Sequence, residues 1–357
     1  MKVLFVTARS DYGGGPRHLN QLVNGLPSDI EIFMAYPENG DPYAEIWKCN
    51  ERISGNFFIP YRKLSVITIF RLRQFIKKNR INIIHSHGNG GGIYSRTVKW
   101  LCPDVKVIHT YHGISDYYRS RTKLLIGDVI GRFLSPFANL YICVSNGERK
   151  VAIERRFSKE HNTIVIYNGI PIPNECVARD EKSTPLRIVT LSRFDYSKNM
   201  ESMYRIAKQL SNAHDVEFIW VGDGEDRPRL ETAAQSENLP IKFVGFTREP
   251  MRYLLDSDLY ISTSRFEGLP YALIEAASLG LPIVASNVKG NNEVVKHNFN
   301  GFLFNTEDEA VHYIQVILND LNTYKRMSKA SVSYYDQNFT EDKMISSILS
   351  IYRKLML

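Results

Sequence analysis

The sequence predicts an α/β fold with two doubly wound, Rossmann-like domains that face a cleft. Short Val- and Ile-rich runs alternate with longer amphipathic stretches, as expected for parallel sheets covered by helices on both faces. This alternation stops at a polar segment with several prolines, residues 171–185, and then restarts. A chain of 357 residues is also long enough for two cores. We therefore expect domains over residues 1–172 and 173–340.

The first domain is expected to alternate six strands with five helices. The strands are the runs KVLFVTA, IEIFMAY, NIIHSH, KVIHTYH, NLYICVS and TIVIYN, and the helices lie near 16–26, 65–79, 92–101, 121–136 and 146–157. The second domain repeats the pattern with LRIVTLS, VEFIWVG, IKFVG, LYISTS, PIVAS and GFLF, and helices near 306–320, 322–335 and 341–355 close the chain. In such sheets ligands bind at the carboxyl ends of the strands, so candidate residues are sought just after each strand.

The net charge of +7 is unevenly distributed. Residues 1–176 carry 24 basic and 14 acidic residues, whereas the remainder carries 21 and 24. Residues 62–80 contain seven Lys and Arg and no acid, interleaved with apolar residues. Residues 117–134 resemble them, with four basic residues, Arg119, Arg121, Lys123 and Arg132, and one acid, Asp128. An anionic membrane surface and nucleic acid are both candidate partners, and a core-facing helix with a solvated basic face is the plainer alternative. No helix-turn-helix, RNP or zinc-finger signature occurs, so nucleic acid is not an expected partner.

Other sequence features bound the location and the chemistry. No signal peptide and no apolar run of about 18 residues is recognised, so a cytoplasmic location is expected. The four cysteines are scattered without a CxxC pair, which predicts buried thiols rather than a disulfide framework or a zinc site. The paired histidines of HSHG (His85 and His87) lack a suitably spaced carboxylate, so no metal site is expected.

Glycines and a histidine follow strands of the first domain. Gly14 and Gly15 stand in RSDYGGGPRH, directly before Pro16, which suits the first position of a helix. The backbone of such a turn can approach a phosphate or a sugar, although a plain structural turn explains it equally well. The pattern is neither GxGxxG nor a P-loop. His112 in TYHG is expected to hydrogen-bond at the cleft edge, whereas His85 and His109 are expected to be structural.

Two cations and a glycine pair follow strands of the second domain. Arg193 and Lys198 in LSRFDYSKN lie on a strand-to-helix loop, where they suit a diphosphate, with two exposed charges as the alternative. Gly222 and Gly224 in VGDGED allow close approach of a ligand or of backbone. The acidic pair of DSD, residues 256–258, joins a helix to a strand and is expected to be structural.

The segment RFEGLPYALIE places Glu267 on a loop and Glu275 on the following helix. Gly268 and Leu269 precede Pro270, which is expected to start that helix. Free N–H groups at a helix start form an anion site, so the two carboxylates flank it and do not form a hydrolytic pair. This arrangement suits a nucleoside diphosphate sugar.

Taken together, these motifs resemble the retaining GT-B glycosyltransferases often called GT4, over nearly the whole chain. The resemblance rests on the early Gly-Gly loop, HG, YNGI, SRFDYSKN, VGDGED, FEGLPYALIE and G-LPIVAS. It implies that Glu275 binds the nucleotide ribose, Glu267 contacts the donor sugar, and Arg193 and Lys198 neutralise the diphosphate. It further implies phosphate contacts from the backbone near Gly268, Leu269 and Pro270, a sugar contact from His112, and a donor pocket lined by Gly14 and Gly15, with Gly222 at the nucleotide.

The resemblance also implies a reaction and a setting. It implies transfer with retention, without a metal or a cofactor, from a UDP- or GDP-sugar to a glycan or lipid-linked acceptor bound by the first domain. It implies that residues 341–357 pack back on that domain. Surface polysaccharide or lipopolysaccharide assembly is the expected setting, with contact to the inner face of the membrane through residues 62–80. The alternatives are a nucleotide-sugar 2-epimerase of the same architecture and an inactive relative that only binds sugar nucleotide. One departure is Asn199, where many members have glycine.

Overall fold

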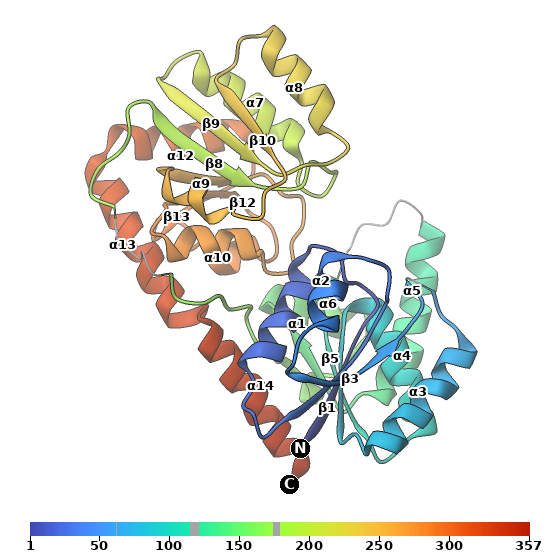
Figure 1. Cartoon of the computed structure of the whole chain (residues 1–357). Helices are drawn as coiled ribbons and strands as arrows, with labels where there is room; N and C mark the ends of the chain where they lie inside the picture. Colours follow the sequence, from blue (N-terminus) through green and yellow to red (C-terminus); the bar gives the residue numbers. More distant parts are fainter. Residues whose placement is uncertain (62, 115–120, 174–178) are drawn as a thin grey trace. The chain divides into compact units, whose positions relative to one another are not determined.

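We describe the protein from a computed structural model that covers residues 1–61, 63–114, 121–173 and 179–357. Arg62, Arg119, Cys176 and the middle of the expected linker lie outside these ranges. The chain forms two compact units, one of Met1–Asn168 with Glu341–Leu357 and the other of Gly169–Thr340 (Figure 1). Each unit holds a parallel sheet with helices packed on it, so the predicted fold class is confirmed in both.

The first unit is built on a seven-stranded parallel sheet of order β3-β2-β1-β4-β5-β6-β7. All six expected strands are present, and the sequence analysis missed the edge strand β3, whose run ISGNFF is broken by Gly and Asn and is not fully buried. The strands are β1 (Lys2–Thr7), β2 (Glu31–Tyr36), β3 (Ile53–Phe58), β4 (Ile83–His87), β5 (Lys106–Thr110), β6 (Leu140–Cys143) and β7 (Thr163–Val165).

Helices cover both faces of this sheet. Because successive strand residues face opposite sides, Leu4 and Val6 pack with α3 and α4, whereas Val3 and Phe5 pack with α1, α2 and α14. The helices are α1 (Gly14–Gly25), α2 (Pro42–Lys48), α3 (Val66–Asn79), α4 (Gly88–Leu101), α5 (Arg121–Leu134), α6 (Asn146–Glu154) and α14 (Glu341–Met356), with 3-10 turns at Ser135–Phe137 and Glu160–Asn162.

The C-terminal helix α14 is part of the first unit. Its buried face includes Ile345, Ile348 and Tyr352. A Cβ on Gly25 would lie 2.2 Å from the Cδ1 of Ile345, so this glycine lets α1 and α14 pack closely. The Tyr352 hydroxyl lies 2.6 Å from Nδ1 of His85, which ties α14 to the middle of β4.

Two helices begin earlier than the sequence predicts. Helix α1 starts at Gly14, so Pro16 lies within the first turn and not at its first position. Helix α4 starts at Gly88 and not near residue 92. Its glycines are required by packing, because a Cβ on Gly91 would lie 2.3 Å from the Val6 carbonyl oxygen and one on Gly92 would lie 2.4 Å from the His109 ring.

The second unit has a six-stranded parallel sheet of order β10-β9-β8-β11-β12-β13, with every expected strand present. Its strands are β8 (Leu186–Leu191), β9 (Val216–Val221), β10 (Ile241–Gly245), β11 (Leu259–Ser262), β12 (Ile283–Ser286) and β13 (Gly301–Phe304). Its helices are α7 (Met200–Ser211), α8 (Arg227–Ser236), α9 (Met251–Leu255), α10 (Tyr271–Ser278), α11 (Asn291–Val294), α12 (Glu307–Asn319) and α13 (Leu321–Asn338).

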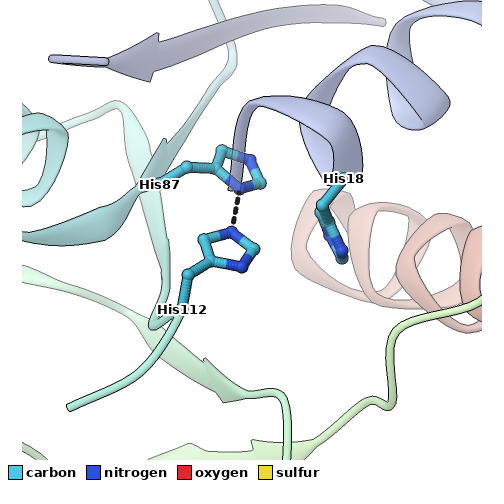
Figure 2. A group of neighbouring side chains, drawn as sticks. All are labelled: His18, His87 and His112. Carbon is cyan, nitrogen blue, oxygen red and sulfur yellow. Dashed lines mark hydrogen bonds between the residues drawn. The ribbon is translucent and has the colours of Figure 1, made fainter. Parts of the chain in front are cut away.

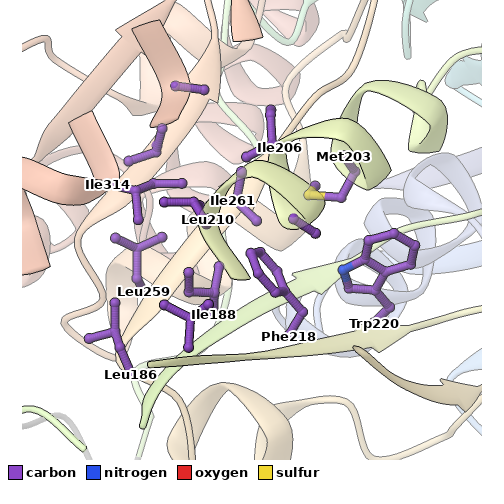
Figure 3. Close-up of a cluster of buried hydrophobic side chains, with 14 of the residues drawn as sticks. Leu186, Ile188, Met203, Ile206, Leu210, Phe218, Trp220, Leu259, Ile261 and Ile314 are labelled. Atoms are coloured by element: carbon purple, nitrogen blue, oxygen red, sulfur yellow. The ribbon is translucent and has the colours of Figure 1, made fainter. Parts of the chain in front are cut away.

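The core of the second unit shows why these runs form a sheet. Apolar side chains from β8, β9 and β11 meet those of α7 and α12, as Figure 3 shows for Ile188, Phe218 and Ile206. Asp258 of the DSD segment is buried, and its carboxylate accepts the N–H groups of Ser183 and Arg187 at 3.0 and 2.8 Å. This acid therefore has the structural role that the sequence analysis expected.

Candidate functional site

The strand order reverses once in each sheet, and the site residues lie after the strands that flank each reversal or after the next strand of the sheet. In the first unit the neighbours are β1 and β4, and in the second they are β8 and β11. Loops after two such strands diverge to opposite faces and leave a crevice at the carboxyl edge, which is the usual ligand position in doubly wound sheets. Each unit therefore has one candidate edge.

In the second unit this edge brings together Lys198, from the loop after β8, and Glu267, from the loop after β11. The Lys198 Nζ lies 2.5 Å from Oε1 of Glu267, and the Ser264 hydroxyl donates to the same oxygen at 2.7 Å. The two side chains are only 20 and 13 % exposed. Because a half-buried pair is less screened than a surface pair, the amine is held in place at the edge.

The backbone beside Lys198 is held equally well. The Thr263 hydroxyl donates to the carbonyl oxygens of Lys198 and Asn199 at 3.0 and 3.1 Å. Asn199 has a φ of 54° and a ψ of 49°, which is the left-handed region. Glycine adopts this region freely and asparagine is the side chain that tolerates it best, which explains why Asn199 can stand where many members have glycine.

Arg193 is placed differently from Lys198. It pairs with Asp195 at 3.0 Å, and its side chain is 63 % exposed. The other carboxylate oxygen of Asp195 accepts the N–H groups of Ser197 and Lys198, at 2.9 and 3.2 Å, and so shapes the loop. The two expected cations therefore share a loop, but only Lys198 contacts Glu267.

Helix α10 begins where the sequence predicts an anion site. Pro270 is its N-cap residue, preceded by Gly268 and Leu269, and Glu275 lies on the helix with 4 % exposure. A Cβ on Gly290 would lie 2.6 Å from the Gly268 carbonyl oxygen, so the loop is packed tightly before the helix starts. The first N–H groups of a helix point away from its backbone hydrogen bonds, and the positive end of the helix dipole favours an anion there.

Gly222 is required by its surroundings. Its φ is +133°, and a Cβ there would lie 1.9 Å from the Ser192 carbonyl oxygen. Its N–H donates to the Gly245 carbonyl at 2.9 Å. Gly222 therefore lets the loop after β9 lie against the loop that carries Arg193 and Lys198.

In the first unit the candidate edge carries three histidines in place of charges. His87 ends β4 and His112 follows β5, and the His87 Nδ1 lies 3.0 Å from the His112 Nε2 (Figure 2). His18, on α1, packs its ring 4.9 Å from that of His112. A Cβ on Gly15 would lie 3.4 Å from the His112 ring, so the glycine turn borders this histidine, and Gly14 begins the helix beside it.

Burial keeps these imidazoles neutral. Desolvation lowers the pKa of His18 to about 4 and the pKa values of His87 and His112 well below the ordinary value. His85 and His109 are also buried with lowered pKa values, and His85 bonds to Tyr352 and Thr110, as expected of a structural residue. The histidines of this edge can therefore offer hydrogen bonds without a positive charge.

Glu148 supports the His112 loop, and the sequence analysis missed it. Its fully buried carboxylate accepts the N–H groups of Gly113 and Ile114 at 2.6 and 2.8 Å through one oxygen, and that of Val144 at 2.9 Å through the other. The available signal was the S-x-x-E pattern of a helix start, because the Ser145 hydroxyl accepts the Glu148 N–H. His18 was missed as well, since only folding brings it to the cluster.

A cavity of about 370 Å³ lies beside His112 within the first unit. Its wall includes Arg9, Lys63, Tyr111 and Gly90. Gly90 thus borders the cavity, but a Cβ there would lie 2.4 Å from the Cβ of Ala8, so close packing also accounts for this glycine. Among the cysteines, Cys102 and Cys143 are buried as expected, whereas Cys49 is exposed.

Comparisons with known proteins agree with this architecture. The family described as glycosyltransferase family 4 matches residues 12–172, and glycosyl transferases group 1 matches residues 174–333. The O-antigen biosynthesis glycosyltransferase WbnH of Escherichia coli is 28 % identical over 342 residues, which cover 94 % of this chain and 96 % of the relative. The UDP-Gal:alpha-D-GlcNAc-diphosphoundecaprenol alpha-1,3-galactosyltransferase of Escherichia coli is 27 % identical and covers 78 and 83 % of the two chains.

Solved structures show the same fold. The Anabaena protein Alr3699/HepE in complex with UDP and glucose aligns with a TM-score of 0.83 at 19 % identity, over 99 % of this chain and all of the other. The lipopolysaccharide outer core galactosyltransferase WaaB aligns with a TM-score of 0.79 at 17 % identity, over 99 and 100 %. The two family matches together span nearly the whole chain, and it therefore belongs to the GT-B glycosyltransferases of the group 1 and family 4 type.

Proposed function

We propose that this glycosyltransferase moves a sugar, with retention, from a nucleoside diphosphate sugar to a lipid-linked glycan in surface polysaccharide assembly. The observation that carries the proposal is the Lys198–Glu267 pair beside the start of α10. It offers a held cation, a hydroxyl-binding carboxylate and the positive end of a helix dipole at one edge of the second unit. A phosphate and a sugar need these three partners together.

We assign each donor contact to a residue of this edge. Lys198, with Arg193, neutralises the diphosphate, and the N–H groups after Gly268, Leu269 and Pro270 bind its oxygens. Glu275 binds the ribose and Glu267 the sugar hydroxyls, while Gly222 lets the loop backbone approach the nucleotide. Neutral His112 offers the donor sugar a hydrogen bond, and Gly14 and Gly15 line its pocket.

The chemistry follows from where charge develops. The acceptor hydroxyl attacks the anomeric carbon on the face that the diphosphate leaves, a donor phosphate oxygen takes its proton, and the bond from carbon to the phosphate oxygen breaks. Lys198, Arg193 and the α10 start stabilise the charge that grows on the leaving diphosphate. We propose that these groups do so without a metal ion.

UDP is the donor nucleotide that the comparisons favour, ahead of GDP. The Anabaena protein was solved with UDP and with UDP-glucose, and the Escherichia coli galactosyltransferase carries UDP-Gal in its name. The same name states a lipid-linked acceptor, diphosphoundecaprenol. The cavity beside His112 has Arg9 and Lys63 in its wall, which suits an acceptor that carries a diphosphate.

A membrane surface is the partner we propose for α3 and α5 of the first unit. Apolar side chains stand exposed on α3 (Val66, Ile67, Phe70) and on α5 (Leu125, Ile126, Val129, Phe133). Basic residues Lys77 and Lys78 end α3, so apolar contact and anionic attraction act together. No helix in the described part of the chain is long and apolar enough to cross a membrane, so we propose peripheral contact at the cytoplasmic face.

Sedimentation with anionic liposomes tests this contact. We expect Ile67→Ser with Phe133→Ser to lower the bound fraction several-fold, because each removes exposed apolar area. The matched control is Ile46→Ser, which changes an exposed apolar residue on α2. Equal sedimentation of all three proteins would contradict a membrane role.

A thermal-shift screen of UDP-, GDP-, ADP- and CMP-sugars tests the donor site. A ligand that binds the native state stabilises it by about 2.7 kcal/mol at a hundred times its Kd. We expect the largest rise with a UDP-sugar, and a much smaller one in Lys198→Ala. No rise with any of the four sugar nucleotides would contradict the proposed donor site.

The two alternatives are disfavoured and can be tested together. An epimerase would consume the donor without an acceptor, and an inactive relative would bind it without turnover. Two relatives that match 94 and 78 % of this chain are named as transferases, which favours transfer. Donor consumption that depends on the acceptor would exclude both alternatives.

A further inference from the structure

Three imidazoles of the first unit lie close enough to share one ion. His18 comes from α1, His87 from the end of β4, and His112 from the loop after β5 (Figure 2). Each offers a ring nitrogen, and these nitrogens all lie within 4.8 Å of one another. The strand order places β4 between β1 and β5, so elements far apart in sequence converge on this point.

The hydrogen bonds of the cluster leave a lone pair available on His18. The Nδ1 of His18 lies 3.1 Å from Oδ1 of Asn168, so it carries the proton and Nε2 carries the lone pair. Within the described part of the chain, the buried Nε2 atoms of His18 and His87 have no hydrogen-bond partner. The exposed fractions of these two residues are 0 and 3 %.

A hydrogen bond from a ring N–H to an amide oxygen is the usual support of a metal-bound histidine, because it fixes the tautomer and orients the ring. Asn168 supplies this support to His18. The neighbouring His85 cannot join, because its two nitrogens already bond to Tyr352 and Thr110. The possible ligand set among these four histidines is therefore three neutral imidazoles.

The ligand type selects the class of ion. Neutral imidazoles suit Zn²⁺, Co²⁺, Ni²⁺ and Cu²⁺, whereas Mg²⁺ and Ca²⁺ prefer oxygen. Three histidines with an open fourth position form a known tetrahedral zinc arrangement. Zinc–nitrogen bonds of about 2.0–2.1 Å separate the nitrogens by roughly 3.4 Å, so nitrogens that now lie up to 4.8 Å apart must approach by up to about 1.4 Å.

We propose that His18, His87 and His112 bind one divalent transition-metal ion, and that the bound ion inhibits sugar transfer. The ion replaces the His87–His112 hydrogen bond. The ring that donates in that bond takes its proton on its other nitrogen, so that both rings turn a lone pair toward the ion. The inhibition rests on the proposed function, since it takes His112 away from the donor sugar. The ion is not a catalytic group.

Cobalt titration tests the site without any assay of activity. Tetrahedral Co²⁺ on nitrogen ligands gives a visible absorption band, which should saturate at one ion per chain. The band should be lost in His18→Gln and in His87→Gln, and Zn²⁺ should displace Co²⁺ in the wild type. The control His161→Gln, which changes an exposed histidine of the same unit, should keep the band.

Wild-type protein gives a second measurement that does not depend on folded variants. Zn²⁺ should raise its thermal midpoint, and a chelator should reverse the rise. The metal site is wrong if there is no band and no rise, or if the band is unchanged in both His18→Gln and His87→Gln. A Co²⁺ band in a protein that transfers no sugar would keep the metal site and overturn the proposed function.

The inhibition by the bound ion is tested separately from the binding of the ion. Zn²⁺ should lower the transfer rate of wild-type enzyme at least tenfold, with recovery on chelation. The transfer rate of His18→Gln should fall by a smaller factor on addition of Zn²⁺ than that of wild type, each compared with its own zinc-free rate. Stoichiometric zinc binding with an unchanged transfer rate would overturn the inhibition and keep the metal site.

Discussion

The two units present different chemistry at the same place in the same kind of fold. Near the strand-order reversal of the first unit lie neutral imidazoles, the buried His87 and the less buried His112. At the reversal of the second unit lie an ion pair, Lys198 with Glu267, and the start of α10. A doubly wound sheet therefore supplies the position of a site, and the loop residues decide what it can bind.

The difference lies in the ligand groups that each edge suits. A diphosphate needs cations and N–H donors, and the loops of the second unit carry the cations. A hydroxyl can bond to a carboxylate such as Glu267 or to a neutral imidazole such as His112. The excess positive charge of the first half lies elsewhere, in segments such as residues 62–80, so net charge alone misplaces the anion site.

Removal of the cation from the charged edge should have the largest effect. We expect Lys198→Ala to lower kcat by about 10²–10³-fold, the usual cost of losing one group that stabilises developing charge. The protein should stay folded, because Glu267 keeps the Ser264 hydroxyl as a partner. Steady-state kinetics and circular dichroism measure the two effects.

The matched control is Lys208→Ala, which removes a lysine that pairs with Glu237 on the surface of the same unit. We expect its kcat to stay within about twofold of wild type, since exposed pairs contribute little. Equal losses in the two variants would remove the distinction between the charged edge and the surface.

A fall in pH should lower the stability of the first unit, which holds the buried His18, more than that of the second unit. Since the pKa of His18 is lowered by burial to about 4, its stabilising contribution is complete above about pH 6.5. That contribution is lost as the pH falls toward 4, because the unfolded state then binds more protons. We expect this one histidine to lower the free energy of unfolding of the first unit by about 2 kcal/mol at pH 5, relative to pH 7.

Calorimetry at pH 7 and pH 5 measures this effect. The first unit should unfold at a lower temperature at pH 5, whereas the second, whose histidines are not buried, should change less. His18→Gln should reduce the difference between the two pH values. A first unit that is as stable at pH 5 as at pH 7 would contradict the account of neutral, desolvated imidazoles.

The smallest effect concerns the backbone beside Lys198. Because Asn199 has a φ of 54°, Asn199→Ala should lower the free energy of unfolding by about 1 kcal/mol, whereas Asn199→Gly should be close to neutral. Chemical denaturation measures both. If alanine were as stable as glycine here, the left-handed backbone would not be the reason for asparagine.

The sequence predicts the strands of both units well, because buried parallel strands are nearly continuous apolar runs. It misses β3, where Gly55 and Asn56 interrupt the run at a sheet edge. The Lys198 and Glu267 motifs are recognisable from sequence because each directly follows a strand. Their salt bridge is not, since it depends on β8 and β11 being neighbours.

The histidine cluster and Glu148 show more clearly what cannot be predicted from the sequence. His18, His87 and His112 are brought together by the order of β1, β4 and β5, which no local pattern encodes. Glu148 acts on Gly113, at a distance of 35 residues along the chain. Sequence reasoning finds residues that follow strands, but it cannot say which of them meet.

The central claim is acceptor-dependent transfer with retention, and the anomeric configuration of the product tests it most directly. The measurement is proton NMR of the product formed from a UDP-α-sugar and a diphosphate-linked lipid acceptor. The account predicts an α-linked product that forms only when the acceptor is present. A β-linked product, or release of free sugar at the same rate without acceptor, would contradict it.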